Sequence, residues 1–275
     1  MTIRHPSLAV SLALVALVAL VAVSLAAPVA AQQAAGAPPR APAIVEVELA
    51  GSNYRLSGGQ QPWREISVRV DARFDARAAA YGLVSHTRRF GLSDTELAAG
   101  TSHPLGPRWT AGGDVTGSTT HRVRAQWSAG AWVRRSLGAE WGVELGVGHR
   151  EYTAARLQAG TLTVERYFGH HRLAYALGVS NVRGADGMIT HRAQAMRGDA
   201  RGDAITLGVA AGREAENVGV DRVLVASVRS VDVWGLRRVT SRWKLMYAIG
   251  LHRYGEIYTR SFARLGVRLR LGEGQ

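Results

Sequence analysis

The last strongly patterned stretch of the chain, residues 262–271, alternates strictly between two kinds of side chain. Its apolar residues share one face of an extended chain: Ala263, Leu265, Val267, Leu269 and Leu271. Its arginines share the other face: Arg264, Arg268 and Arg270. A period of two is typical of a β-strand. Because the chain repeats this pattern many times, the sequence predicts an all-β fold whose strands each have one apolar and one charged or small face.

The N-terminal residues predict an export signal. Arg4 and His5 precede an apolar run over residues 8–27, and Val29 and Ala31 are small residues at the spacing that signal peptidase recognises. We expect residues 1–31 to be a signal peptide cleaved after Ala31. Residues 32–44 are rich in Ala and Pro and are expected to be a disordered periplasmic linker. An uncleaved anchoring helix is the alternative, because about 20 apolar residues suffice to span a membrane.

No apolar stretch after Ala31 is long enough to cross a membrane as a helix. A mature chain that spans a membrane must therefore do so as a closed barrel, in which every backbone polar group is paired. We expect a transmembrane antiparallel up-and-down β-barrel over residues 45–272. Its fourteen predicted strands are residues 45–54, 63–74, 78–90, 95–103, 108–116, 122–134, 141–152, 156–167, 172–181, 190–197, 204–213, 222–234, 242–254 and 259–271. The fourth, fifth and tenth are weakly apolar, which leaves a count of 12 open.

A soluble all-β fold, such as a periplasmic sandwich, is the alternative to a membrane barrel. It predicts fewer strands and more polar outer faces. Burying the second face of these strands in a soluble core would leave charged groups without water, which is costly.

The charge of the chain is strongly positive, at +13, and 33 of its 34 basic residues are arginine. Proteins that bind nucleic acid gather such charge in one patch. Here the arginines are spread along the chain and alternate with apolar residues, so we expect no nucleic-acid partner. The absence of cysteine excludes disulfides and thiolate metal sites.

The polar faces of the predicted strands define a lumen rich in arginine. The basic residues expected to line it, as a path for anions, are Arg69, Arg73, Arg124, Arg134, Arg150, Arg172, Lys244, Arg264, Arg268 and Arg270. Their expected acidic partners in the lumen are Glu46, Glu48, Asp71, Glu144 and Glu165. Closure places the first and last strands side by side, which predicts ion pairs between them. The acids balance only part of the arginines, so we expect a positive surplus.

Aromatic residues near strand ends are expected to form a girdle at the membrane interfaces. The expected girdle is Trp63, Trp141, Trp234, Trp243, Tyr54 and Tyr254. Trp127 and Trp132 fall nearer the middle of a predicted strand, on opposite faces. The longest connections are predicted at residues 55–62, 182–189 and 214–221, on the side away from the periplasm.

Several short motifs, in this order, resemble the YaiO family of outer-membrane β-barrel proteins. They are Trp63-Arg-Glu65, Tyr81-Gly-Leu83, residues 88–94 (RRFGLSD), residues 122–132, residues 146–152 (GVGHREY) and residues 166–169 (RYFG). The resemblance covers residues 45–271 and implies an outer-membrane barrel without an established activity. Some relatives carry a helical-repeat domain ahead of the barrel, which suggests a role with envelope polysaccharide, and we expect this chain to lack that domain. The chain also ends without the terminal aromatic residue that the barrel-assembly machinery commonly reads.

The sequence predicts no enzyme, because no nucleophile, base and orienting group fall on adjacent inward positions. Three histidine arrangements are candidates for catalysis: the pair His170-His171 at a turn, His191 with Ser180 or Ser227, and His252 beside Lys244. Each is explained more simply by solvation or lumen lining. The histidines lack metal-ligand spacing, and the Gly/Asp turns have too few carboxylates for calcium. We therefore expect no catalytic residues, no metal and no cofactor.

Three functions follow from these patterns. The first is an outer-membrane pore or conduit for small anions or envelope polysaccharide, with arginines as in anion-selective pores. The second is a structural or interaction barrel with a filled lumen that binds lipopolysaccharide. The third and weakest is a barrel enzyme acting on lipid or glycan. Expected partners are outer-membrane lipids, lipopolysaccharide and the barrel-assembly machinery.

Overall fold

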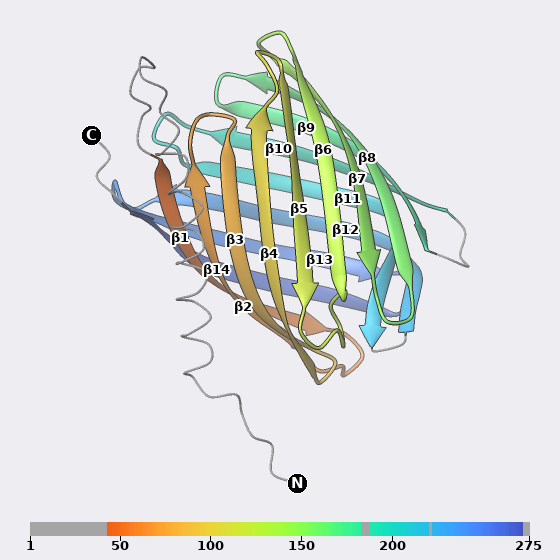
Figure 1. Cartoon of the computed structure of the whole chain (residues 1–275). Coiled ribbons are helices and arrows are strands. Elements are labelled where there is room, and N and C mark those ends of the chain that lie inside the picture. Colours follow the sequence, from red (N-terminus) through yellow and green to blue (C-terminus); the bar gives the residue numbers. More distant parts are fainter. Residues whose placement is uncertain (1–42, 183–186, 220–221, 272–275) are drawn as a thin grey trace.

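The computed structural model describes residues 43–182, 187–219 and 222–271, which form a closed barrel of antiparallel strands (Figure 1). Each strand pairs with its neighbours in sequence, and β1 pairs with β14 to close the sheet. The fourteen strands are β1 (Ile44–Leu56), β2 (Trp63–Arg73), β3 (Ala79–Arg89), β4 (Leu92–Pro104), β5 (Trp109–Ser118), β6 (Trp127–Leu137), β7 (Trp141–Glu151), β8 (Arg156–Phe168), β9 (His171–Val182), β10 (Met188–Gly198), β11 (Ala204–Gly219), β12 (Arg222–Arg238), β13 (Trp243–Tyr254) and β14 (Tyr258–Leu271).

The predicted fold class and the count of fourteen strands are confirmed, and the alternative of 12 strands is wrong. The three weakly patterned segments are complete strands: β4, β5 and β10. The expected signal peptide and most of the linker lie outside the described residues. Ile44, expected to be the last residue of the linker, belongs to β1, where it pairs with Arg73 in β2. No helix long and apolar enough to cross a membrane occurs in the described part of the chain.

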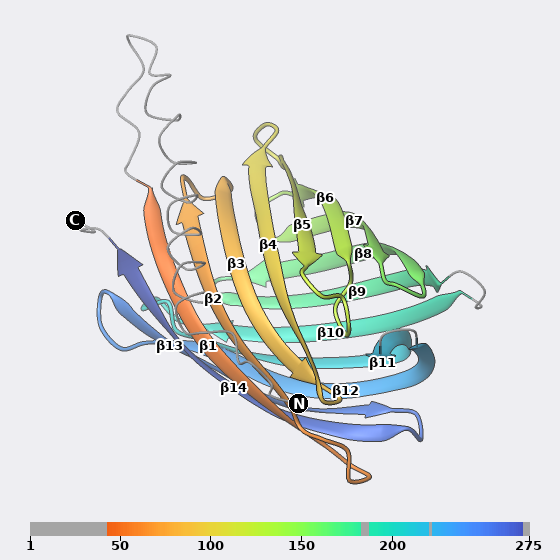
Figure 2. The same ribbon diagram turned by 60° about the horizontal axis from the view of Figure 1, so that its bottom comes forward.

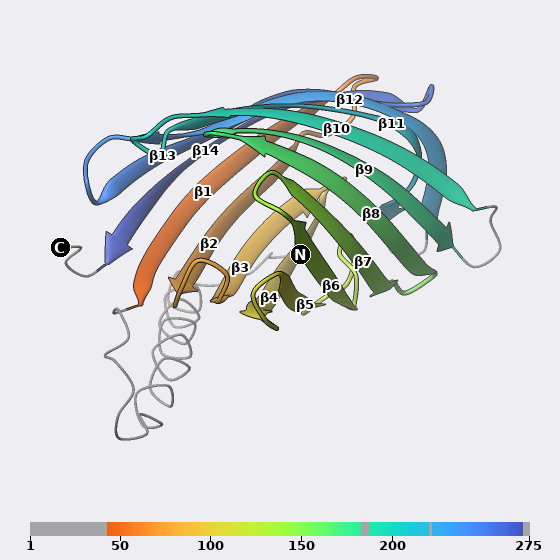
Figure 3. The ribbon, with the colours of Figure 1, turned by 90° about the horizontal axis from the view of Figure 1, so that it is seen from above.

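The strands run up and down between two ends of the barrel (Figures 2 and 3). We call the end that carries Ile44, the start of β1, and Leu271, the end of β14, the terminal end. We call the opposite one the far end. At the seam, Val45 is paired with Leu271 and Leu56 with Arg260. This register places the even-numbered residues of β1 and β14 on the same face, which is the face that points inward.

The outward face is apolar over most of the barrel. Large aliphatic side chains stand exposed along successive strands, for example Leu145 at 56%, Val147 at 68% and Leu265 at 64%. A soluble protein rarely exposes an apolar surface this extensive. The alternation of an apolar outer face with a polar inner face is the pattern of a barrel surrounded by lipid.

Several predicted strand boundaries were wrong, most of all those at β6 and β11. β6 begins at Trp127 rather than at residue 122, because residues 119–126 form a loop that turns inward. Trp127 is therefore at a strand end on the outer face, where it stacks on His149. β11 continues to Gly219, so most of the connection expected at residues 214–221 is strand. The expected long connection at residues 182–189 falls largely on residues 183–186, outside the described part.

The expected aromatic girdle was wrong for four of its six residues. Trp141 and Trp243 do point outward at the terminal end, where Trp109 and Phe168 join them. Trp63, Tyr54, Tyr254 and Trp234 point inward instead. Position near a strand end does not determine the face, whereas parity does. Trp63, for example, has the parity of inward Glu65 rather than that of outward Ile66.

Two inward tryptophans lie over glycines of a neighbouring strand. The Trp132 ring covers Gly112, where an added Cβ would come within 2.4 Å of a ring atom. The Trp234 ring covers Gly208 in the same way, at 2.7 Å. A glycine in a strand often marks such a close approach. The inward position of Trp132 agrees with its predicted parity.

Candidate functional site

The seam between β1 and β14 carries a network of ion pairs on the inner wall. Glu46 and Glu48 on β1 are buried. Lys244 Nζ lies 2.5 Å from Glu46 Oε1, and Arg268 Nη1 lies 3.3 Å from Glu46 Oε2. Arg268 Nη2 reaches Glu48 Oε2 at 2.6 Å, and Arg264 Nη2 reaches Glu48 Oε1 at 3.0 Å. The prediction of ion pairs between the first and last strands is realised in this geometry.

The network continues onto β2 and β3. Arg69 donates from Nε to both carboxylate oxygens of Asp71, at 2.9 and 3.1 Å, and its guanidinium lies 3.8 Å from the centre of the Tyr81 ring. Glu65 accepts hydrogen bonds from Arg124 and from the Thr87 hydroxyl. Strands far apart in sequence are thus joined by side chains inside the barrel as well as by backbone hydrogen bonds.

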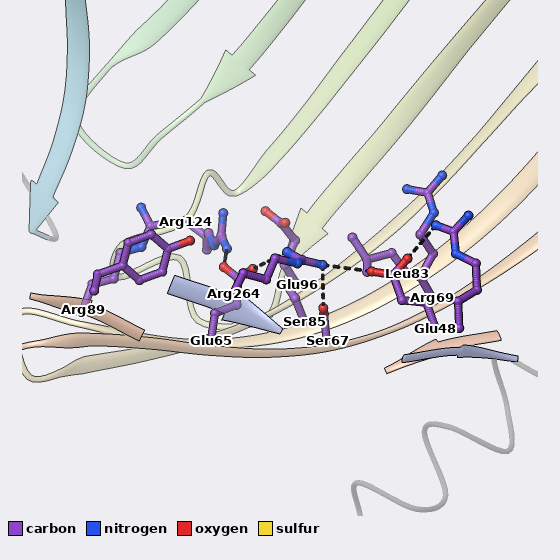
Figure 4. A pocket seen from close by; sticks show the side chains of 12 residues that line it. Glu48, Glu65, Ser67, Arg69, Leu83, Ser85, Arg89, Glu96, Arg124 and Arg264 are labelled. Carbon is purple, nitrogen blue, oxygen red and sulfur yellow. Dashed lines mark hydrogen bonds and ion pairs between the residues drawn. The ribbon is translucent and has the colours of Figure 1, made fainter. Parts of the chain in front are cut away.

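A pocket of about 480 Å³ opens in the lumen above this network (Figure 4). We call it the arginine pocket. Its lining includes five arginines and three glutamates: Arg69, Arg89, Arg124, Arg264, Arg268, Glu48, Glu65 and Glu96. The remaining lining residues are Tyr54, Ser67, Leu83 and Ser85. The strands that supply these side chains are β1 to β4 and β14, together with the loop that precedes β6.

The two signs of charge differ in their access to the pocket. The Glu48 side chain is 3% exposed, whereas the side chains of Arg264 and Arg268, which bind it, are 32% and 21% exposed. Glutamate is short and lies on the wall, and the longer arginines extend over it. At Glu48 the water-facing surface is therefore formed by guanidinium groups, whereas Asp71 on β2, at 27%, is nearly as exposed as its partner Arg69 at 33%.

A second cluster lies across the lumen on β6, β8, β9 and β10. Glu165 is buried at its centre and forms ion pairs with Arg134 and with Arg172, the latter at 3.3 Å. The Tyr167 hydroxyl donates to Glu165 and accepts from Arg134, at 2.8 and 2.7 Å. Arg172 also donates to the Gln194 side-chain oxygen at 2.9 Å. Here too a buried carboxylate is covered by more exposed arginines.

The loop of residues 119–126 is held inside the barrel by one carboxylate. Asp94 is almost fully buried and accepts hydrogen bonds from the backbone N–H groups of Arg122, Val123 and Arg124, at 3.0, 2.7 and 2.7 Å. The Thr120 hydroxyl binds the same carboxylate. We call these hydrogen bonds the Asp94 latch. They hold the loop so that the Arg124 side chain reaches Glu65. The sequence predicted that Arg124 lines the lumen as part of a strand, but it does so from an inward-folded loop.

An aromatic cluster fills part of the interior near the far end. Trp63, Tyr254, Tyr258 and Val228 are buried against one another, with Tyr54, Leu56 and Phe90 packed around them. Arg260 lies over the Trp63 ring at 5.0 Å, and Arg89 lies over the same ring at 4.8 Å. This cluster narrows the lumen next to the arginine pocket.

The remaining predicted lumen residues lie on the inward face without close partners. Arg73 and Arg270 are near the terminal end, and Arg150 is near the far end opposite Ser128. None of them makes an ion pair with another residue in the described ranges. Glu144 faces Arg134 across the β6–β7 pair but does not contact it within ion-pair distance.

Several inward charged residues were missing from the predicted set. They are Arg89, Arg192, Arg238, Arg260, Glu65, Asp94, Glu96, Asp114, Glu214, Glu216 and Asp232. Most could have been found by extending the alternation of each strand to its end, since Arg260 has the parity of Arg264 and Glu65 that of Arg69. The additional acids make the positive surplus of the lumen smaller than predicted.

The histidine arrangements considered for catalysis are not assembled. His191 points outward and is hydrogen-bonded to the Tyr175 hydroxyl at 2.6 Å, whereas Ser180 has inward parity. His252 contacts Arg260 at 3.1 Å instead of Lys244. His171 stacks on Phe168. Within the described residues, no group of three or more His, Asp or Glu side chains is placed to hold a metal ion.

Comparison with known proteins agrees with this geometry. The family model of the YaiO membrane beta barrel domain matches residues 45–217. Comparison with curated proteins finds no match. Among solved structures, the chain is similar to a bacterial polysaccharide outer membrane secretin, with a TM-score of 0.53 and 10% identity over 86% of this chain and 100% of that one.

Two porins are also similar in fold. An anion-selective porin from Comamonas acidovorans has a TM-score of 0.48 and 9% identity, over 83% of this chain and 99% of that one. The KdgM porin in complex with disordered oligogalacturonate has a TM-score of 0.43 and 11% identity, over 82% of this chain and 99% of that one. At these identities the likeness concerns the barrel fold alone.

Proposed function

The chain belongs to the YaiO family of membrane β-barrel proteins, and on that basis we propose that it is an outer-membrane conduit for anions. The solutes would be small anions or the acidic segments of an envelope polysaccharide. They would move along the guanidinium-covered wall that includes the arginine pocket. The closed barrel supports a path across the membrane. The guanidinium groups on its inner wall favour anions over cations as the solutes.

The observation that carries this proposal is the unequal exposure of the two charges at the inner wall. Glu48 and Glu165 are almost completely covered, whereas their partners Arg264 and Arg134 retain about a third of their side-chain surface. Arginine presents several N–H donors in a planar fork that matches carboxylate, sulfate or phosphate. An anion in the lumen would therefore meet donors first, with the balancing carboxylates behind them.

The size of the path favours narrow or extended solutes. The aromatic cluster and the loop of residues 119–126 occupy the side of the lumen formed by β12 to β14 and β1 to β4. The opposite wall carries small inward residues, including Gly146, Gly148, Ala176 and Ala210. Passage along that wall would bring an extended anionic chain past Arg172, Arg192 and Arg134.

The proposal also includes the export of the chain and its orientation in the outer membrane. We expect the signal peptide to be removed after Ala31 and both ends of the barrel chain to face the periplasm, so that the far end faces outward. The turns at the terminal end, such as residues 138–140 and 169–170, are short, as periplasmic turns of such barrels are. An intact mass of the purified protein that begins at Gln32 would support this export route, and one that begins at Met1 would refute it.

The conduit is tested by recording purified protein in planar bilayers. We expect step conductances and a reduction of current by an acidic oligosaccharide such as oligogalacturonate, but not by a neutral oligosaccharide of the same length. Arg192→Glu should weaken the block by the acidic sugar, since Arg192 is inward and exposed and has no ion-pair partner among the described residues. The matched control is Arg197→Glu, on the outward face of the same strand.

A filled-lumen barrel without transport is the second candidate function. The aromatic cluster and the Asp94 latch favour it, because both fill interior space with residues that pack against one another. This candidate predicts no conductance from a correctly folded protein. If protein with normal heat-modifiable mobility on a gel gave no conductance in bilayers, this structural role would replace the conduit as the proposed function.

A further inference from the structure

Six arginines form an outward-facing belt near the far end. The far-end arginine belt consists of Arg88 on β3, Arg64 on β2, Arg55 on β1, Arg253 on β13, Arg229 on β12 and Arg213 on β11. All six are exposed. In the closed barrel, β14 lies between β1 and β13, so the belt follows seven adjacent strands with only β14 lacking an arginine. At that level β14 presents the hydroxyl groups of Thr259 and Ser261.

The belt brings like charges directly opposite one another. Arg64 is paired with Arg88 across β2 and β3, and Arg229 with Arg253 across β12 and β13. Like charges in cross-strand pairs are destabilising. None of the six forms an ion pair with any residue that the structure describes. Binding of an anion from outside the chain would relieve the repulsion between these arginines.

The surface is hollowed at two points of the belt, on either side of β14. One hollow, of about 670 Å³, is lined by Arg55, Arg64, Asn53, Gln60 and Ser261, among others. The other, of about 280 Å³, is lined by Arg229, Arg253, Ser227, Gly255 and the carboxylate-bearing Glu256. Arg55 is paired with Ser261 and Arg253 with Thr259 on β14, so the two arginines lie two strand spacings apart sideways and two residues apart along the strands, or about 12 Å between Cα atoms.

The level of the belt matches a membrane interface. On β13 the outward residues from Trp243 to Arg253 enclose only apolar side chains: Leu245, Tyr247, Ile249 and Leu251. Ten residues of strand tilted by about 40° span about 25 Å, which is the height of the apolar band of such barrels. Trp243 therefore lies at one interface and Arg253 at the other.

Outward arginines at the terminal end are arranged differently. Arg135 lies over the Trp109 ring at 5.2 Å, and Arg166 lies over the Trp141 ring at 5.3 Å and pairs with Glu140 at 3.2 Å. Arg135 and Arg166 therefore have partners within the chain, whereas Arg197 and Arg237, also outward at this end, form no ion pair with a described residue. What distinguishes the far end is that six outward arginines without ion pairs among the described residues gather on neighbouring strands, four of them directly opposite one another in two pairs.

We propose that the far-end arginine belt is a binding site for lipopolysaccharide, with the phosphate groups of its lipid A held in the two hollows beside β14. Guanidinium groups bind phosphate bidentately and strongly. The Thr259 and Ser261 hydroxyls between the hollows suit the sugar that links two phosphates. Acyl chains of the same molecule would lie on the apolar band below. The site is on the lipid-facing surface and is independent of any passage through the lumen.

The test measures lipid binding to detergent-purified protein by native mass spectrometry. The probe is bisphosphorylated lipid A, compared with dephosphorylated lipid A, phosphatidylglycerol and inorganic phosphate. The variant Arg55→Gln/Arg64→Gln/Arg229→Gln/Arg253→Gln should bind bisphosphorylated lipid A at least about tenfold more weakly. The matched control Arg135→Gln/Arg166→Gln/Arg197→Gln/Arg237→Gln removes the same charge at the terminal end and should bind as the unchanged protein does.

Folding of both variants is verified by heat-modifiable mobility, and single substitutions at Arg55 and Arg253 serve if the fourfold variant does not fold. Equal binding by the far-end and terminal-end variants would overturn the proposal. So would dephosphorylated lipid A or phosphatidylglycerol binding as tightly as bisphosphorylated lipid A. Displacement of the lipid by millimolar inorganic phosphate would show that a free anion suffices and would equally refute a glycolipid site.

Discussion

Arg264 and Glu48 are 216 residues apart in sequence, yet Arg264 Nη2 lies 3.0 Å from Glu48 Oε1 across the pair of strands that closes the barrel. Arg268 binds the other oxygen of the same carboxylate at 2.6 Å. One buried acid thus fixes two arginines at the seam and leaves their guanidinium groups facing the lumen. The same arrangement links the stability of the closed wall to the charge of its inner surface.

Glu48→Gln should destabilise the barrel. The neutral amide leaves Arg264 and Arg268 partly buried with less compensating charge, and breaking a buried pair in this way costs about 3 kcal/mol. The measurement is the urea midpoint of unfolding in detergent, followed by tryptophan fluorescence. Glu140→Gln is the control, because the exposed Glu140–Arg166 pair contributes less than about 1 kcal/mol. Equal midpoints for the two variants would contradict the role assigned to Glu48.

Asp94→Ala should release the loop of residues 119–126 from the interior. The substitution removes the acceptor of three backbone N–H groups, those of Arg122, Val123 and Arg124. Hydrogen exchange of these three amides should accelerate at least about tenfold, since each buried bond contributes about 1 kcal/mol or more. Asp199→Ala, which affects a turn at the terminal end, is the control. Unchanged exchange at residues 122–124 would show that other contacts hold the loop.

Trp63→Ala should be among the most destabilising substitutions in the chain. Trp63 is fully buried in the aromatic cluster, and removing such a side chain costs about 3–5 kcal/mol. Trp141→Ala, at an exposed girdle position, should cost much less. The free energies of unfolding of the two variants are compared in the same detergent. A larger loss for Trp141→Ala would mean that the lipid interface stabilises the barrel more than the cluster does.

The fold could be predicted from the sequence because alternation, strand length and the absence of a spanning helix all point to one architecture. The pairing of the last strand with the first could also be predicted, because a closed barrel requires it. The boundaries of β6 could not be predicted, because Arg122, Val123 and Arg124 continue the alternation of Trp127 and its successors. Only the three-dimensional position of Asp94 reveals that this segment is a loop.

The candidate site could be predicted in its residue types but not in its arrangement. Parity placed Arg264, Arg268, Glu46 and Glu48 on the inner wall, which is a local property of each strand. The covering of carboxylates by arginines depends on side-chain packing between strands and leaves no trace in the alternation. Residues of the aromatic cluster were predicted on the wrong face. Trp63, for example, lies at a strand end, as a girdle residue would, but has inward parity.

The turn at residues 74–78 should lose its order in acid. The Asp75 carboxylate accepts the backbone N–H groups of Arg77 and Ala78, at 2.6 and 2.7 Å, and these bonds hold its pKa below the ordinary value of 3.8. Its stabilisation of the turn is therefore complete above that value and is lost as the pH falls through the lower, folded-state pKa. The Arg77 amide chemical shift should titrate with a midpoint below 3.8, and not at all in Asp75→Asn. A midpoint at or above 3.8 would contradict the turn geometry.

The cationic surface of the lumen can be measured directly with one introduced thiol. Leu83 lines the arginine pocket and the chain has no cysteine of its own, so Leu83→Cys gives a single reactive position. We compare its rates of reaction with an anionic and a cationic methanethiosulfonate of similar size, each divided by its rate with free cysteine. The anionic reagent should react several-fold faster, and the preference should shrink when Arg69 and Arg264 are replaced by Gln. Equal rates, or a faster reaction with the cationic reagent, would contradict a lumen surface formed by guanidinium groups.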